Sequence, residues 1–146
     1  MSEQLAEKFI EALGELESSE NADNIASLFS DSSEIGNSTL TQSFKGADGA
    51  REFWTNYRKT FGEVKSEFKN KIISDNVSAL EWTTTGTSAD GNEINYDGVS
   101  ILEADGEKIT RFFAYFNPSD LGHQIIDGES AKSKDASYGR KFEKRR

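Results

Sequence analysis

Residues 108–116 read KITRFFAYF and alternate between two kinds of position. The alternate residues are Phe112, Ala114 and Phe116 on one parity, and Arg111, Phe113 and Tyr115 on the other. Successive side chains of a β-strand point to opposite faces of its sheet, so each set covers one face. Pro118 follows the stretch and lacks the backbone N–H that strand pairing needs. The stretch therefore predicts the last strand of a sheet.

Three further strands are predicted upstream of this one. We expect them at residues 64–72, 77–87 and 94–104. The residues between the strands are Asp75-Asn76, Asp90-Gly91-Asn92 and Asp105-Gly106. Such sequences form the tight turns that join neighbouring antiparallel strands. In the first strand, the even-numbered residues Val64, Ser66, Phe68, Asn70 and Ile72 are expected to face the core, because charged residues occupy the odd positions. The four strands should form an antiparallel meander.

The first half of the chain has the apolar spacing of helices. A first helix is expected over residues 2–18, with one apolar face made by Leu5, Phe9, Ala12, Leu13 and Leu16. A third helix is expected from Asp48, with a stripe made by Ala50, Phe53, Trp54, Tyr57 and Phe61. Gly62 is expected to end this third helix, because glycine is common just after a helix C-terminus.

Between these two helices, the sequence predicts a second helix and one short strand. Asp23 or Asn24 can cap a short helix, and its apolar residues would be Ile25, Leu28 and Phe29. The Ser-rich stretch that follows contains Ile35 and predicts a short strand, then a loop as far as Gly46. The predicted fold class is therefore α+β.

The composition limits both the core and the chemistry. The chain has 146 residues, which is enough for one domain with one core. Hydrophobic residues make up 34% of it, and the 10 Phe, 4 Tyr and 2 Trp supply much of the buried area. There is no Cys and only one His, His123. The usual Cys- and His-based metal sites are thereby excluded, and we expect neither a metal nor a cofactor.

The charge is distributed unevenly along the chain. Residues 1–127 contain 10 Lys or Arg and 23 Asp or Glu, whereas residues 128–146 contain 7 and 3. We therefore expect a single acidic domain over residues 1–127 and a basic, disordered tail over residues 128–146. An acidic domain repels phosphate backbones, which argues against nucleic acid as a partner. Without a signal peptide or an apolar run of about 18 residues, we expect no membrane association and a cytoplasmic location.

Four segments give the sequence a resemblance to a known family. They are Phe53-Trp54 and residues 79–83, 98–103 and 108–116. In order and spacing they resemble the nuclear transport factor 2-like superfamily, in its SnoaL-like branch, which includes polyketide cyclases and ketosteroid isomerases. The resemblance covers about residues 3–126. It implies a cone-shaped α+β barrel, in which three N-terminal helices pack on a curved antiparallel sheet, with a pocket at the wide end and a homodimer through the outer sheet face.

Strand parity predicts which residues line that pocket. The concave face should carry Leu80, Trp82, Thr84, Tyr96, Gly98, Ser100, Leu102, Phe112, Ala114 and Phe116. The opposite set is Val99, Ile101, Arg111, Phe113 and Tyr115. It is too apolar to remain in water, which is a second reason to expect a dimer through the outer face.

The catalytic groups implied by the resemblance are missing. The isomerase base falls on Asn37, and its two oxygen-binding groups fall near Leu13 and Ser100. The charged groups of the epoxide-hydrolase branch fall on Trp82, Thr84 and Ala114. The Phe-Asp pair of polyketide cyclases is Phe116-Asn117 here, and an amide cannot act as a general acid or base.

Three functions remain open from the sequence. The first is a small-molecule-binding protein with an apolar, aromatic-lined pocket for a hydrophobic ligand. Its predicted lining is Asn37, Trp54, Tyr57, Trp82, Tyr96, Ser100, Phe112 and Phe116. The second is a cyclase- or isomerase-like enzyme acting on a hydrophobic cyclic substrate, with Asp31 or Glu34 beside Asn37 as a non-standard acid/base. The third is an interaction dimer whose pocket is incidental. A carboxylate inside the cone would favour the enzyme, and a pocket filled by Phe and Trp side chains would favour the third function.

Overall fold

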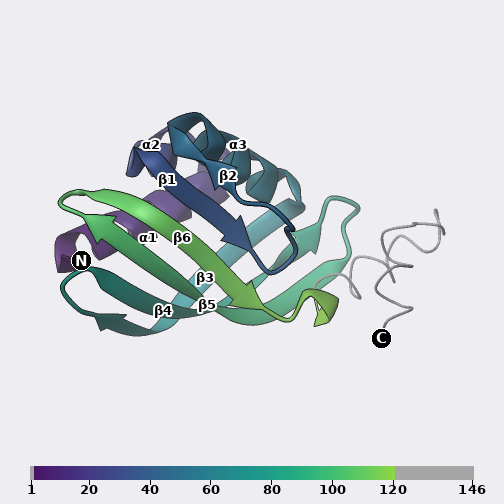
Figure 1. The fold of residues 1–146 in the computed structure, drawn as a ribbon. Coiled ribbons are helices and arrows are strands. Elements are labelled where there is room, and N and C mark those ends of the chain that lie inside the picture. The colour runs from purple at the N-terminus through teal and green to yellow at the C-terminus, as the bar shows by residue number, and fades with distance from the viewer. Residues whose placement is uncertain (1, 121–146) are drawn as a thin grey trace.

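The computed structural model of the chain describes residues 2–120 (Figure 1). Its elements are α1 (Glu3–Ser19), α2 (Asp23–Ala26), β1 (Phe29–Asn37), β2 (Phe44–Lys45), α3 (Gly46–Lys59), β3 (Phe61–Ile73), β4 (Val77–Ser88), β5 (Glu93–Asp105) and β6 (Lys108–Phe116). The α+β class and the order of the long elements are as predicted. None of the described helices is long and apolar enough to cross a membrane. The predicted tail and His123 lie outside the described residues.

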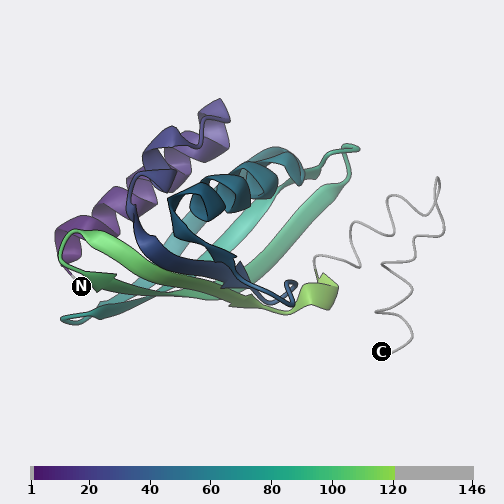
Figure 2. The same ribbon diagram turned by 45° about the horizontal axis from the view of Figure 1, so that its top comes forward.

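The strands form one six-stranded sheet in the order β2-β1-β6-β5-β4-β3. Strands β3 to β6 are the expected antiparallel meander. Strand β1 pairs with the edge of β6 that faces away from β5, and it runs parallel to β6. Helices α1 and α3 cover one face of the curved sheet, while no described element covers the opposite face (Figure 2). This arrangement is the cone implied by the family resemblance, with the helices inside it.

Helix α1 forms because its ends are capped and one face is apolar. At its start, the Ser2 hydroxyl accepts a hydrogen bond from the Leu5 N–H at 3.0 Å. At its end, Glu20 adopts a left-handed conformation, and its N–H donates to the Leu16 carbonyl. Leu5, Phe9 and Leu16 on the apolar face are all buried. The helix therefore docks on the concave face of the sheet by the stripe that the sequence predicted.

Two predicted helix ends were wrong. The second helix stops at Ala26, and its predicted member Phe29 instead starts β1 beside Ile109. No side chain of Asp23 or Asn24 caps this helix, since the side chain of Asn21 accepts the Asp23 N–H instead. Gly62 does not end α3 either. It lies in β3, where a Cβ atom would come within 2.8 Å of Thr87 Oγ1. The absence of a side chain therefore allows β3 and β4 to approach closely at this position.

A bulge in β3 places the second half of this strand on the face opposite to the predicted one. Phe68 pairs with Trp82, yet Asn70 already pairs with Glu81, so one extra residue lies between them. An extra residue of this kind reverses the parity of everything that follows. Asn70 and Ile72 therefore lie on the outer face instead of the inner one, and Ile72 is 68% exposed. Val64, Ser66 and Phe68, before the bulge, face inward as predicted.

Candidate functional site

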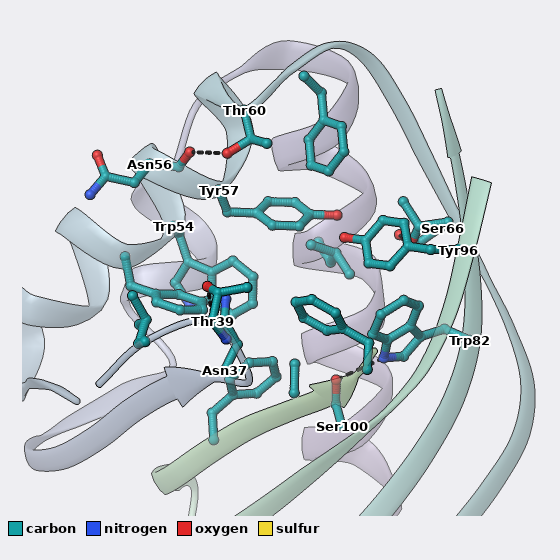
Figure 3. A pocket seen from close by; sticks show the side chains of 18 of the residues that line it. Asn37, Thr39, Trp54, Asn56, Tyr57, Thr60, Ser66, Trp82, Tyr96 and Ser100 are labelled. Carbon is teal, nitrogen blue, oxygen red and sulfur yellow. Dashed lines mark hydrogen bonds between the residues drawn. The ribbon is translucent and has the colours of Figure 1, made fainter. Parts of the chain in front are cut away.

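The concave face and the helices enclose one large apolar cavity of about 270 Å³. All eight residues that the sequence predicted for the pocket lie in its wall: Asn37, Trp54, Tyr57, Trp82, Tyr96, Ser100, Phe112 and Phe116. Trp54 and Tyr57 of α3 face Trp82 and Tyr96 of the sheet across the space (Figure 3). The structure thus brings the set together, and whether the set binds a ligand stays a prediction.

The sheet wall of the cavity is organised around Trp82. In the register of the sheet, Trp82 pairs with Gly98. A Cβ atom on Gly98 would lie 2.4 Å from the Trp82 ring, so the absence of a side chain lets the indole lie against the backbone. The Trp82 Nε1–H donates to Ser100 Oγ at 2.9 Å, which fixes the ring orientation. Ser100 therefore positions the Trp82 ring, and its hydroxyl oxygen serves as the acceptor of this hydrogen bond.

Asn37 lies at the cavity edge as the last residue of β1, paired with Ala114 of β6. Its side-chain oxygen accepts from the Thr39 N–H at 2.9 Å and from the Thr39 hydroxyl at 2.7 Å. These contacts make a turn that is typical of asparagine after a strand. Only the amide nitrogen of Asn37 is left without a hydrogen bond to residues 2–120, so it is available as a donor to a ligand.

A second buried donor lies in the helical wall. Trp54 is 2% exposed, and its Nε1 has no hydrogen-bond partner among the described residues. Most buried N–H groups are paired, since burying an unpaired one costs about 1–3 kcal/mol. Five aromatic rings contact this indole: Phe9, Phe29, Phe53, Tyr57 and Phe112. Trp54 is thus core and cavity wall at once.

Behind Tyr57 and Ser66, at the inner end of the cavity but outside its lining, lies a carboxylate that was not predicted from the sequence. Glu17 of α1 is 6% exposed. One oxygen accepts the Ser66 N–H at 2.9 Å, and the other accepts the Ser66 hydroxyl at 2.7 Å and the Tyr57 hydroxyl at 2.8 Å. Ser66 Oγ also lies 2.7 Å from Thr84 Oγ1. Both carboxylate oxygens are therefore occupied by donors from α3 and β3.

Arg58 holds the backbone beside Glu17 in place. Its Nε donates to the Glu17 carbonyl at 3.1 Å, and its two terminal nitrogens donate to the carbonyls of Phe61 and Gly62 at 3.0 and 3.1 Å. Its only ion pair within residues 2–120 is a 3.7 Å contact with Glu20. The guanidinium thus links the end of α1 to the start of β3, and no ion pair forms with the Glu17 carboxylate.

Two tyrosines at this inner end have perturbed acidities. Burial, followed by the negative charge of Glu17, raises the pKa of Tyr57 well above its ordinary value. The same two causes raise the pKa of Tyr96. Both phenols therefore stay protonated throughout the physiological pH range, Tyr57 as a donor to Glu17.

The residues proposed as a non-standard acid/base are elsewhere. Asp31 and Glu34 line a separate polar groove with Lys45 and Arg111, on the outer side of β1 and β6. Glu34 is paired with Lys45 at 2.9 Å, and the hydrogen bond and charge of this lysine lower the pKa of Glu34. Neither carboxylate lines the cone, so this part of the enzyme hypothesis was wrong.

Comparisons with known proteins agree with this architecture. The sequence model of the SnoaL-like domain matches residues 6–112, and the chain belongs to this family. A comparison with curated proteins gives no match. An NTF2-like protein of unknown function from Exiguobacterium sp. 255-15 is 22% identical with a TM-score of 0.66, covering 77% of this chain and 98% of its own.

Two other similar structures carry more specific descriptions. TerC, co-crystallised with polyporic acid, is 17% identical with a TM-score of 0.72, covering 83% of this chain and 97% of its own. An LEH-like epoxide hydrolase from M. tuberculosis is 18% identical with a TM-score of 0.64, covering 88% of this chain and 91% of its own. At these identities the likeness shows the NTF2-like fold alone.

Proposed function

We propose that this protein binds a planar, hydrophobic small molecule inside the cone. The observation that carries the proposal is an apolar cavity that stays open between Trp54, Tyr57, Trp82 and Phe116 although the core around it is tightly packed. Apolar concave sites with a few polar groups are the usual form of small-molecule sites. TerC, of the same fold, was co-crystallised with a small molecule, polyporic acid, which supports the same type of use.

The volume limits the ligand to a modest size. A cavity of about 150 Å³ holds one benzene ring, and the cavity here is about 270 Å³. It therefore suits a ligand of about two fused rings. A four-ring steroid would need the helices to move apart.

The enzyme hypothesis has weaker support. Glu17 does place a carboxylate near the cavity, but it is not among the lining residues, and Ser66 and Tyr57 lie between it and the cavity and donate three hydrogen bonds to it. A general base needs a free lone pair within hydrogen-bond reach of the substrate proton. The contacts of Glu17 therefore favour a role in shaping and polarising the site, and binding is the better supported function.

The proposed binding can be tested by filling the cavity. Ala114 lies in the cavity wall near the end of β6, so Ala114→Leu places new side-chain volume where the ligand would lie. We expect naphthalene to bind the wild type and to bind this variant at least about tenfold more weakly, measured by isothermal titration calorimetry. The free energy of unfolding of Ala114→Leu should differ from that of the wild type by less than about 2 kcal/mol, because the added side chain enters open space.

The matched control is Ala89→Leu, the same change at an exposed turn between β4 and β5. It should bind naphthalene like the wild type. Binding by Ala114→Leu that equals this control would contradict the proposed location, and no binding by the wild type would contradict the proposed function.

We also propose that two copies associate through the outer sheet face. Ile72, Ala79, Ile101 and Phe113 lie side by side across β3, β4, β5 and β6 on this face. Beside this row lies Tyr115, which is 49% exposed. Charged residues border these apolar side chains at both ends, with Glu34, Lys45, Glu103 and Arg111 in the row on one side and Glu81 and Asp97 on the other. An apolar centre inside a polar rim is the usual anatomy of an interface.

If two copies associate through this face, a single charged substitution at its centre should prevent dimer formation. Ile101→Glu places a carboxylate in the centre of the apolar row, where two-fold symmetry would bring two such charges together. We expect the wild type to be dimeric and this variant monomeric at micromolar concentration, measured by gel filtration with light scattering. Glu11→Lys, on the exposed side of α1, should remain dimeric. A monomeric wild type would contradict the dimer.

The cytoplasmic location rests on the sequence alone and also stays a prediction.

A further inference from the structure

The two tyrosine hydroxyls at the inner end of the cavity differ in their hydrogen bonding. Tyr57 donates its proton to Glu17, so its oxygen has only lone pairs left to offer. Tyr96 is 5% exposed, and no hydrogen bond of its hydroxyl is found within residues 2–120. The two hydroxyls point toward one another from α3 and β5 (Figure 3). The inner end thus offers one acceptor and one uncommitted donor close together.

We propose that this end of the cavity is a subsite for a neutral hydroxyl group on the ligand. The ligand hydroxyl would donate to Tyr57 Oη and accept from the Tyr96 hydroxyl, which completes the chain from Tyr96 through the ligand to Tyr57 and Glu17. The inference rests on the proposed function and narrows its ligand class. That class is a phenol or enol whose hydroxyl lies at one end of a flat apolar body of about two rings.

The surroundings of the subsite explain why the hydroxyl should be neutral. Glu17 of α1 is the charged group behind Tyr57, and Ser66 of β3 and Thr84 of β4 add only neutral hydroxyls. No lysine or arginine is among the residues that line the cavity within the described part of the chain.

The nearest cation does not offset this charge at the cavity. Arg58 of α3 is bound to three backbone carbonyls and to the exposed Glu20. A phenolate at the subsite would therefore face a negative charge in a poorly solvated place, with no cation to offset it. The site differs from one that stabilises an oxyanion, because it should hold the proton on the ligand.

A pair of probes separates the subsite from the cavity as a whole. Naphthalene and 2-naphthol have the same two-ring body and differ in one hydroxyl. We expect the wild type to bind 2-naphthol about tenfold more tightly than naphthalene, measured by calorimetry, because two hydrogen bonds form at the inner end. Tyr96→Phe should remove most of that difference, so that the two probes bind this variant with similar affinity. Tyr115→Phe, which removes an exposed hydroxyl from the outer face, should keep the full difference.

The results of this experiment have distinct meanings. Equal binding of the two probes, or an unchanged preference in Tyr96→Phe, would overturn the subsite while leaving the proposed function in place. Failure of both probes to bind would overturn the proposed function and the subsite with it. Thermal melts of each variant check that the fold is intact, and removing the uncommitted Tyr96 hydroxyl breaks no hydrogen bond within residues 2–120.

The ionisation of the bound probe tests the charge of the site. The naphtholate form of 2-naphthol absorbs at longer wavelength than the protein, so it can be titrated in the complex. We expect the ionisation midpoint of bound 2-naphthol to move upward by about one pH unit, and by less in Glu17→Gln, which removes the negative charge. A midpoint that moves downward would show an oxyanion-binding site and would overturn the inference. If Glu17→Gln does not fold, Tyr57→Phe, which keeps the carboxylate but removes the acceptor, should still reduce the preference for 2-naphthol over naphthalene.

Discussion

Replacement of Phe112 by alanine is expected to lower the free energy of unfolding by about 3–5 kcal/mol. Phe112 is 3% exposed, and its ring centre lies 5.0 Å from that of Trp54, 5.5 Å from Phe9 and 5.9 Å from Phe53. It thus joins α1 and α3 to the sheet. Deletion of such a side chain loses its burial energy and leaves a cavity that packed neighbours cannot fill. Urea unfolding followed by circular dichroism measures the loss.

Phe116 is the matched comparison for Phe112. It is on the same strand and the same face, but it is only partly buried, and its ring neighbours are Trp82 and Tyr96 at 6.3 and 5.2 Å. Phe116→Ala should lower the free energy of unfolding by about 1–2 kcal/mol, because this side chain buries less apolar area on folding than Phe112 does. It should weaken the free energy of naphthalene binding by a larger amount. Equal losses of stability in the two variants would contradict the difference in burial between Phe112 and Phe116.

The second large effect concerns Arg58. We expect Arg58→Met to destabilise the protein by about 2–4 kcal/mol, because the carbonyls of Glu17, Phe61 and Gly62 lose their donors while methionine keeps most of the side-chain volume. Without these hydrogen bonds, the backbone at Glu17 should also be held less rigidly. We therefore expect a smaller preference for 2-naphthol over naphthalene. Thermal and urea unfolding measure the first effect, and calorimetry measures the second.

Arg51 provides the control on the same helix. It is paired with Asp23, but both side chains are more than half exposed. Exposed ion pairs contribute little, so Arg51→Met should change stability by less than about 0.5 kcal/mol. If the two arginine variants were equally stable, the buried hydrogen bonds of Arg58 would not hold α1 to β3 as described.

Strand parity explains why much of the site was predictable. Phe112, Ala114 and Phe116 alternate strictly with their neighbours, and the structure confirms that they face the helices. The same rule failed in β3, because the bulge between Phe68 and Asn70 shifts the register and nothing in the local sequence marks it. The parallel pairing of β1 with β6 could not be derived from local patterns either, because it joins residues far apart in the chain, such as Asn37 and Ala114.

Glu17 was missed for a different reason. The sequence reasoning followed apolar residues along the first helix and searched for carboxylates only at positions implied by the family. Phe9, Leu13 and Glu17 are spaced by four residues, so they lie on one face of α1. A carboxylate that continues a buried row is a signal for a buried polar contact. Its partners Ser66 and Tyr57, however, come from β3 and α3 and are visible only in the folded chain.

The central claim is that the cone itself is the binding site, and a crystal structure of the protein grown with 2-naphthol tests it most directly. We predict one molecule between Trp54 and Trp82, with its ring system against Ala114 and Phe116 and its hydroxyl at the inner end of the cavity. A ligand bound on the outer sheet face, or a cavity that is closed by its own aromatic side chains in the presence of saturating 2-naphthol, would contradict the account.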